Sequence, residues 1–249
     1  MSFGSWARRL LVGTPFEGVA RRIYLAFSPA RGVQYERELA AVMRRALRPQ
    51  HCCIDVGAYR GAVLSEMLAL APGGTHFAFE PAPPQYAYLT RRFPQVHTYR
   101  LALSDTSGET SFYYVRSRPT YSGLRKVRYP SAGEQVEELR VPTARLDEVI
   151  PSEQPVHFVK VDVEGAEYHV FVGGLELLRR WRPLLVFEHG LTSAWYYQRP
   201  SAALYDLLAG EVGYQLWLMR DWLDGRSPLG RDAFVRAVEV DRHYYFLAQ

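Results

Sequence analysis

Cysteine is scarce in this chain of 249 residues, which contains only two, adjacent to each other at Cys52 and Cys53. They lie inside an apolar run and have no other cysteine to pair with, which excludes a disulfide-stabilised scaffold and a cysteine-rich zinc site. We therefore expect buried thiols in a reducing compartment, and hence a cytoplasmic protein.

Long hydrophobic runs are also missing. No apolar stretch approaches the roughly 18 residues that a membrane-spanning helix requires, and the apolar run at 10–12 is too short for a secretory signal peptide. The sequence therefore predicts no transmembrane segment.

A strong charge of one sign is absent as well. Lys and Arg number 30 against 26 Asp and Glu, and the basic residues are spread along the chain rather than gathered in one block. This pattern is typical of a solvated surface, and we expect no nucleic-acid partner. What the chain does have is 48% hydrophobic residues, which is enough for one large globular domain.

Apolar residues recur at helical spacing near the N-terminus, at Phe16, Val19, Ala20, Ile23 and Phe27. This periodicity predicts an amphipathic helix, with Thr14 and Glu17 as a capping box at its start. Such a helix could lie on an anionic membrane surface, but packing on its own domain as a lid is the simpler expectation. We therefore divide the chain into an N-terminal helical cap at 1–48 and a main domain at 49–249.

The main domain alternates short β-like runs with longer helical patterns, which is typical of parallel strands joined by crossover helices. Strands are expected at 52–58, 76–80, 96–103, 156–163 and 184–188, and helices at 62–71, 84–93, 166–180 and 201–208. The pattern predicts an α/β fold with a doubly wound, mostly parallel sheet.

Two regions depart from this alternation. Residues 107–142 are rich in turn residues and contain a strand-like run at 110–115, so we expect a β-hairpin insertion with a mobile loop. Near the C-terminus, β-forming runs at 214–219 and 243–247 follow each other without a long helix between them. An antiparallel hairpin at the edge of the sheet is the expected result.

A glycine motif follows the first predicted strand, in the segment Asp55-Val-Gly-Ala-Tyr-Arg-Gly61. Glycine lets the backbone approach a ligand closely, because no Cβ stands in the way. A dinucleotide-binding turn would carry three glycines as G-x-G-x-x-G, whereas this segment has two and begins with an acidic residue, which favours a cationic ligand. An ordinary strand-turn-helix corner is the alternative. The predicted ligand-binding residues of this segment are Asp55, Gly57, Ala58, Tyr59 and Gly61.

The next two strands also end in candidate binding residues. Glu80, followed by Pro81, ends the second strand, where its carboxylate could accept hydrogen bonds from both hydroxyls of a ribose. Leu103, Ser104 and Asp105 follow the third strand, where they could pack on an adenine ring and bond its amino group. An ordinary surface carboxylate and a plain turn are the alternatives for these two loops.

Acidic residues end the last two strands of the predicted parallel sheet. Asp162 and Glu164 follow one strand, and Glu188 and His189 end the next, so topology aims all four at the same rim. We predict a catalytic rim in which His189 takes the proton of a hydroxyl, because its pKa suits that role near neutral pH. The three carboxylates could also hold a magnesium ion, or could bind substrate without a metal.

Taken together, the segments DVGAYRG, FEP, ALSD, KVDVEGAE and FEH resemble the FkbM family of methyltransferases, in the family's order, over roughly residues 50–190. The resemblance implies a class I, Rossmann-like methyltransferase fold with S-adenosylmethionine as its cofactor. The cofactor residues that it implies are Asp55, Gly57, Gly61, Glu80, Ser104 and Asp105. Asp162 is expected to reach the methionine end of the same cofactor.

The resemblance also implies the reaction, which is O-methylation of a hydroxyl on a small molecule such as a sugar, a glycoside or a polyketide-type natural product. A homo-oligomer is compatible with it. Two other functions stay open from the sequence. The basic pI of about 9.1 permits an RNA ribose methyltransferase, and a methyltransferase-like interaction module without activity is the non-enzymatic alternative.

Overall fold

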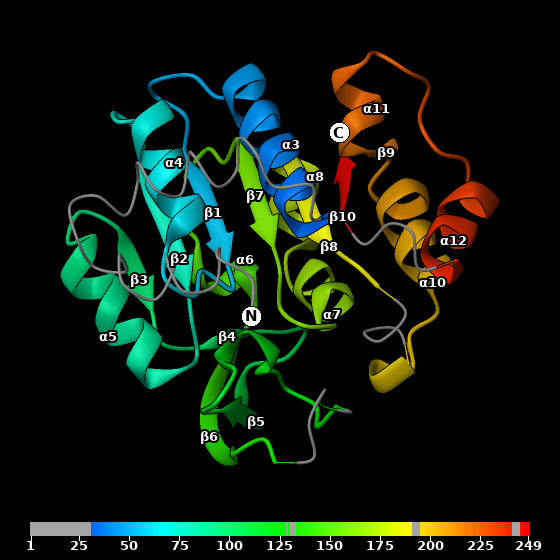
Figure 1. Cartoon of the computed structure of the whole chain (residues 1–249). Helices are drawn as coiled ribbons and strands as arrows, with labels where there is room; N and C mark the ends of the chain where they lie inside the picture. The colour runs from blue at the N-terminus through cyan, green and yellow to red at the C-terminus, as the bar shows by residue number, and fades with distance from the viewer. Residues whose placement is uncertain (1–30, 128, 130–132, 191–194, 241–244) are drawn as a thin grey trace.

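A seven-stranded sheet forms the centre of the protein, in the order β3-β2-β1-β7-β8-β10-β9 (Figure 1). The computed structural model describes residues 31–127, 129, 133–190, 195–240 and 245–249. The strands are β1 Cys53–Val56, β2 His76–Phe79, β3 His97–Tyr99, β7 Phe158–Val161, β8 Leu184–Glu188, β9 Leu216–Leu218 and β10 Tyr245–Ala248. Within the described residues, the pairings of this sheet are parallel except those of β10, which runs antiparallel to β8 and β9. The predicted α/β fold and its antiparallel C-terminal pair are therefore confirmed.

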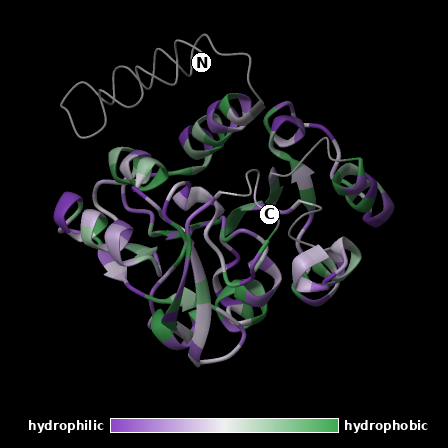
Figure 2. Ribbon diagram, turned by 60° about the horizontal axis from the view of Figure 1, so that its bottom comes forward, coloured by the Kyte–Doolittle hydropathy of each residue, from purple (hydrophilic) through white to green (hydrophobic). Residues whose placement is uncertain are grey.

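Helices cover both faces of this sheet, because successive residues of a strand point to opposite faces. The first face, which includes Cys53 and Val186, packs against four of the described helices. These are α3 Arg31–Ala46, α4 Ala62–Leu70, α5 Pro83–Arg92 and α11 Met219–Leu223. The covering helices carry hydrophobic and hydrophilic residues together (Figure 2). The amphipathic helix predicted at 14–27 lies outside the described residues.

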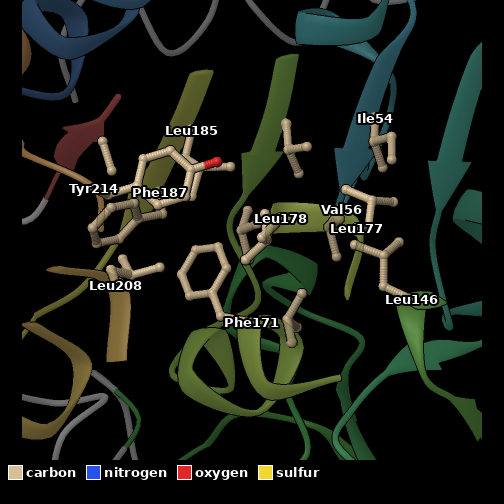
Figure 3. Close-up of a cluster of buried hydrophobic side chains, with 14 of the residues drawn as sticks. Ile54, Val56, Leu146, Phe171, Leu177, Leu178, Leu185, Phe187, Leu208 and Tyr214 are labelled. Carbon is tan, nitrogen blue, oxygen red and sulfur yellow. The ribbon is translucent and has the colours of Figure 1, made fainter. Parts of the chain in front are cut away.

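The second face carries the larger apolar core. Val56 and Phe187 of the strands meet Phe171 and Leu178 of the helices there (Figure 3). The helices of this face are α6 Leu146–Val149, α7 Glu167–Val172, α8 Leu175–Trp181, α10 Ser201–Tyr205, the π-helical turn η2 Asp206–Glu211 and α12 Arg231–Glu239. None of the described helices is long and apolar enough to cross a membrane.

The predicted hairpin insertion forms a second, smaller sheet, beyond the ends at which the parallel strands finish (Figure 1). Its strands are β4 Ala102–Leu103, β5 Gly108–Val115 and β6 Val136–Ala144. β5 and β6 pair antiparallel along their length, as predicted for a hairpin. A short 3₁₀ turn, η1 Pro119–Tyr121, follows β5, and Gly123 then pairs with Tyr113, which folds this segment back onto the sheet.

Three sequence predictions were wrong in detail. The strand expected at 96–103 is two strands, because Ala102 and Leu103 leave the main sheet to pair with β6. The helix expected at 166–180 breaks into α7 and α8 at Gly173, where a Cβ would lie 2.0 Å from the backbone oxygen of Ser104. The last two strands are also separated by α11 and α12, although no long helix was expected between them.

The close contact at Gly173 generates a stability prediction. We expect Gly173→Ala to destabilise the protein by roughly 1–3 kcal/mol, because the new methyl group must displace backbone. Gly210→Ala is the control, since a Cβ there would meet nothing within 4 Å. Urea unfolding of both variants measures the difference, and a Gly173→Ala protein as stable as Gly210→Ala would contradict the packing described here.

Candidate active site

A pocket opens at the edge where β1, β2 and β7 end, and the insertion supplies its opposite wall. Parallel strands of an open α/β sheet bind ligands at this edge. The predicted residues that line the pocket are Asp55, Gly57, Ala58, Tyr59, Glu80, Pro81, Leu103, Asp162 and Glu164. Side chains from four separate loops of the sequence therefore meet around one cavity.

The glycine loop after β1 takes a conformation that few residues other than glycine adopt. Gly57 has a φ of 74°, and a Cβ on it would lie 1.9 Å from the backbone oxygen of Asp162. Tyr59 also has a positive φ, 49°, which costs free energy in a residue with a side chain and is found mainly at functional sites. Gly61 does not line the pocket. It lets the loop pack against Phe93, whose ring would be 2.3 Å from its Cβ.

Glu80 lies at the end of β2 with its carboxylate on the pocket wall. It accepts a hydrogen bond from the backbone N–H of Tyr59 at 2.8 Å and another from that of Ala82 at 3.0 Å. Burial raises the pKa of the carboxyl group to about 7, against these two bonds. Each carboxylate oxygen can accept a further hydrogen bond, so the residue can still bind a ribose diol.

Lys160 is a central residue of the site that the sequence analysis did not single out. Its ammonium donates to the backbone oxygen of Gly57 at 3.0 Å, and lies 3.4 Å from Asp55 Oδ1 and 3.3 Å from Asp162 Oδ2. Burial alone would lower the pKa of Lys160, but the two carboxylates raise it above its usual value. A lysine between two valines of a buried strand was the available signal, because a buried charge needs a partner.

The acidic residues predicted to share a rim do come together. Ligand atoms of Asp162, Glu164 and Glu188 all lie within 4.8 Å of one another. Tyr245, which the sequence analysis also missed, donates a hydrogen bond from its hydroxyl to Asp162 Oδ2 at 2.6 Å. Glu164 has a φ of 53°, so its backbone is strained at this position.

The three carboxyl groups have different affinities for a proton. Burial opposes ionisation of Asp162, but the positive charge of Lys160 lowers its pKa below the usual value. Burial, and then the charge of Asp162, raise the pKa of Glu164 and of Glu188 well above theirs. Neighbouring acids with separated pKa values are the arrangement that enzymes use to divide acid and base roles.

His189 does not join this rim, which contradicts its predicted role as the base. Its ring stacks on Phe234 in the second-face core, and its Nε2 lies 3.0 Å from Ser201 Oγ. The physical reason is strand alternation: Glu188 points to one face of the sheet, so the next residue points to the other. Burial lowers the pKa of His189 to about 4.

The loop predicted to contact adenine lies only partly at the pocket. Leu103 lines the pocket, whereas Ser104 and Asp105 are not among the lining residues. The carboxylate of Asp105 accepts from Ser104 Oγ at 3.1 Å and lies 2.9 Å from His169 Nδ1. Phe112 of the insertion lines the pocket instead, and as one of three consecutive aromatic residues in a β-like run it gave no signal of this from sequence.

The buried imidazole of His189 generates a prediction about pH. Its pKa is about 4 when folded, against 6.5 for an unperturbed histidine, so between these values the unfolded chain binds a proton that the folded one does not. Stability must therefore fall as the pH drops through this window, by roughly 3 kcal/mol for such a shift. We expect the free energy of unfolding of the wild type to fall between about pH 7 and pH 4 by roughly 3 kcal/mol more than that of His189→Gln. Urea unfolding at both pH values measures the difference. Identical pH slopes would contradict the neutral, buried state of His189.

Comparisons with known proteins identify the family of the chain. Residues 55–216, well over half of the chain, match the methyltransferase FkbM domain family. The chain is 25% identical over 201 residues to the 2-O-methyltransferase NoeI of Sinorhizobium fredii (strain NBRC 101917 / NGR234), a match that covers 72% of this chain and 79% of NoeI.

A solved structure supports the fold. The chain resembles the methyltransferase FkbM from Methylobacillus flagellatus KT with a TM-score of 0.50 and 13% identity. The match covers 97% of this chain but 60% of that protein, so the chain spans less than two thirds of that relative. The glycine loop, the carboxylate at the end of β2 and the match over residues 55–216 lead to one conclusion: the chain belongs to the FkbM family of S-adenosylmethionine-dependent methyltransferases.

Proposed function

We propose that the protein methylates a hydroxyl group of a small molecule, of the sugar, glycoside or polyketide type. The observation that carries the proposal is the cluster of Asp162, Glu164 and Glu188. Asp162 and Glu164 of this cluster line the pocket together with the glycine loop. Carboxyl groups bind hydroxyls and can take their protons. The relative NoeI is a 2-O-methyltransferase, which supports oxygen as the methyl acceptor.

The residues around the pocket suit S-adenosylmethionine. Glu80 would hold the ribose diol, the glycine loop at Gly57 would let the chain approach the methionine portion, and the apolar side chains of Leu103 and Phe112 would flank the adenine. The bound cofactor supplies a methyl group already activated by a positively charged sulfur. The protein then has to hold the hydroxyl oxygen in line with that methyl group, which is a positioning task.

The proton of the hydroxyl needs an acceptor, and Glu164 replaces His189 as our candidate. It lines the pocket with Asp162, and because its pKa is raised, its carboxylate, once ionised, is a stronger base than that of an ordinary glutamate. In the reaction, the acceptor oxygen would form a bond to the methyl carbon as the carbon–sulfur bond breaks. The hydroxyl proton would pass to the ionised carboxylate of Glu164, and S-adenosylhomocysteine would leave with a neutral thioether.

A magnesium ion at the same three carboxylates is the alternative that the sequence already raised. Carboxylate oxygens are its preferred ligands, and it keeps several waters of its own. The two arrangements differ in one measurement. If a chelator abolishes methyl transfer and magnesium restores it, the cluster holds a metal; unchanged transfer favours proton transfer to a glutamate.

The cofactor half of the proposal is tested at Glu80. We expect Glu80→Gln to weaken binding of S-adenosylhomocysteine by roughly 10- to 150-fold, the range for losing hydrogen bonds to a charged group. Titration calorimetry measures this, and thermal unfolding without ligand shows whether the variant stays folded. Wild-type affinity in a folded Glu80→Gln protein would place the ribose elsewhere.

The chemical half is tested at Glu164. Loss of a positioned base typically slows a reaction by roughly 10²–10⁴-fold, so we expect Glu164→Gln to slow methyl transfer by that much at saturating cofactor. His189→Gln is the matched control, and its rate should stay within a few-fold of wild type. The assay follows labelled methyl transfer to a panel of methyl glycosides and polyketide alcohols, with RNA included. Label on RNA alone would reject the small-molecule proposal, and an undiminished rate in Glu164→Gln would reject the base.

A further inference from the structure

The first residue of β10 reaches the same edge of the sheet at which β7 and β8 end. β10 runs antiparallel to its neighbours, so it begins where they finish. Tyr245 pairs directly with Glu188, and Val161 pairs with Phe187, which puts Asp162 one step further at the same level. Asp162, Glu188 and Tyr245 therefore form a row across three adjacent strands.

The hydroxyl of Tyr245 holds one oxygen of Asp162. It donates to Asp162 Oδ2 at 2.6 Å, and the ammonium of Lys160 lies 3.3 Å from the same atom. Hydrogen bonds to a carboxylate are directional and about twice as strong as those between neutral groups. Two donors from two different strands thus restrict rotation of a carboxylate that lines the pocket.

The ring of Tyr245 is itself held in place. It packs against the apolar cluster of the first face, and its centroid lies 5.4 Å from that of Tyr35 on α3. This packing fixes where the hydroxyl points, so the donor is preorganised rather than recruited when a ligand arrives. The first described helix and the last strand of the chain therefore meet at the row.

We propose that Tyr245 is a positioning residue that holds the Asp162 carboxylate toward the sulfonium of the bound cofactor. The inference rests on the cofactor placement proposed above, in which the methionine portion lies at Gly57. Gly57 is in close contact with Asp162, because a Cβ on it would lie 1.9 Å from the Asp162 backbone oxygen. S-adenosylmethionine carries a positive charge on sulfur, whereas S-adenosylhomocysteine does not. An anion fixed beside that sulfur favours the substrate over the product through Coulomb attraction, so Tyr245 would set the discrimination between them and help the product to leave.

The experiment measures the affinities of S-adenosylmethionine and S-adenosylhomocysteine by titration calorimetry, without any acceptor. In Tyr245→Phe, the ratio of the two affinities should shift against S-adenosylmethionine by about 3- to 10-fold, part of the effect expected for a hydrogen bond to a charged group. Asp162→Asn should shift the ratio in the same direction by at least as much. Tyr214→Phe is the matched control, because it also removes a buried hydroxyl, one that donates to Pro183 O at 2.8 Å, and its ratio should equal that of wild type.

An unchanged ratio in Tyr245→Phe would overturn the inference, whether both affinities stay at the wild-type values or fall equally through a general disturbance of the pocket. An unchanged ratio in Asp162→Asn would also overturn it, because the carboxylate would not face the sulfur. A wild type that binds both ligands with the predicted shifts in its variants, but methylates no hydroxyl, would reject the proposed reaction and leave the role of Tyr245 standing.

Discussion

The active site depends on one buried ammonium group. Lys160, on β7, connects this strand to β1. Its ammonium contacts Asp55 on β1, the backbone oxygen of Gly57 in the loop after β1, and Asp162 at the end of β7. A buried charge is tolerated only when partners compensate it, and removing one partner of such a group is costly. Asp55 therefore has an internal partner, and the glycine loop is held at the end of β7.

The same lysine contributes to the difference in pKa between the neighbouring acids. It favours the anion at Asp162, while Glu164 and Glu188 lie beside that anion and hold their protons more tightly. Acidic side chains at this density would repel one another strongly if all were ionised. The site resolves the repulsion by giving Asp162 a cation and leaving Glu164 and Glu188 with raised pKa values.

One wall of the pocket, and a hydrogen-bond partner of Asp162, come from parts of the chain far from the motifs. The insertion contributes Phe112 and Leu124, and the antiparallel strand β10 brings Tyr245 to the edge where parallel strands end. These elements lie around the residues proposed to hold the cofactor. If the proposed function is right, they are the parts of the chain best placed to select the methyl acceptor.

The sequence by itself determined whatever depends on local pattern. Alternating β-like and helical runs predicted the α/β sheet, the two glycines and Asp55 predicted the loop after β1, and Glu80 was found from its place at the end of the second strand. Only the tertiary structure decided what depends on contacts between distant residues. Pairing with β6 split the expected third strand, and an antiparallel strand brought Tyr245 to Asp162, 83 positions away in the chain. The position of His189 on the face opposite to Glu188 follows instead from strand alternation, a local pattern that the sequence analysis did not use. Periodicity records which face a residue takes within its own element, but it carries no information about which other element lies opposite.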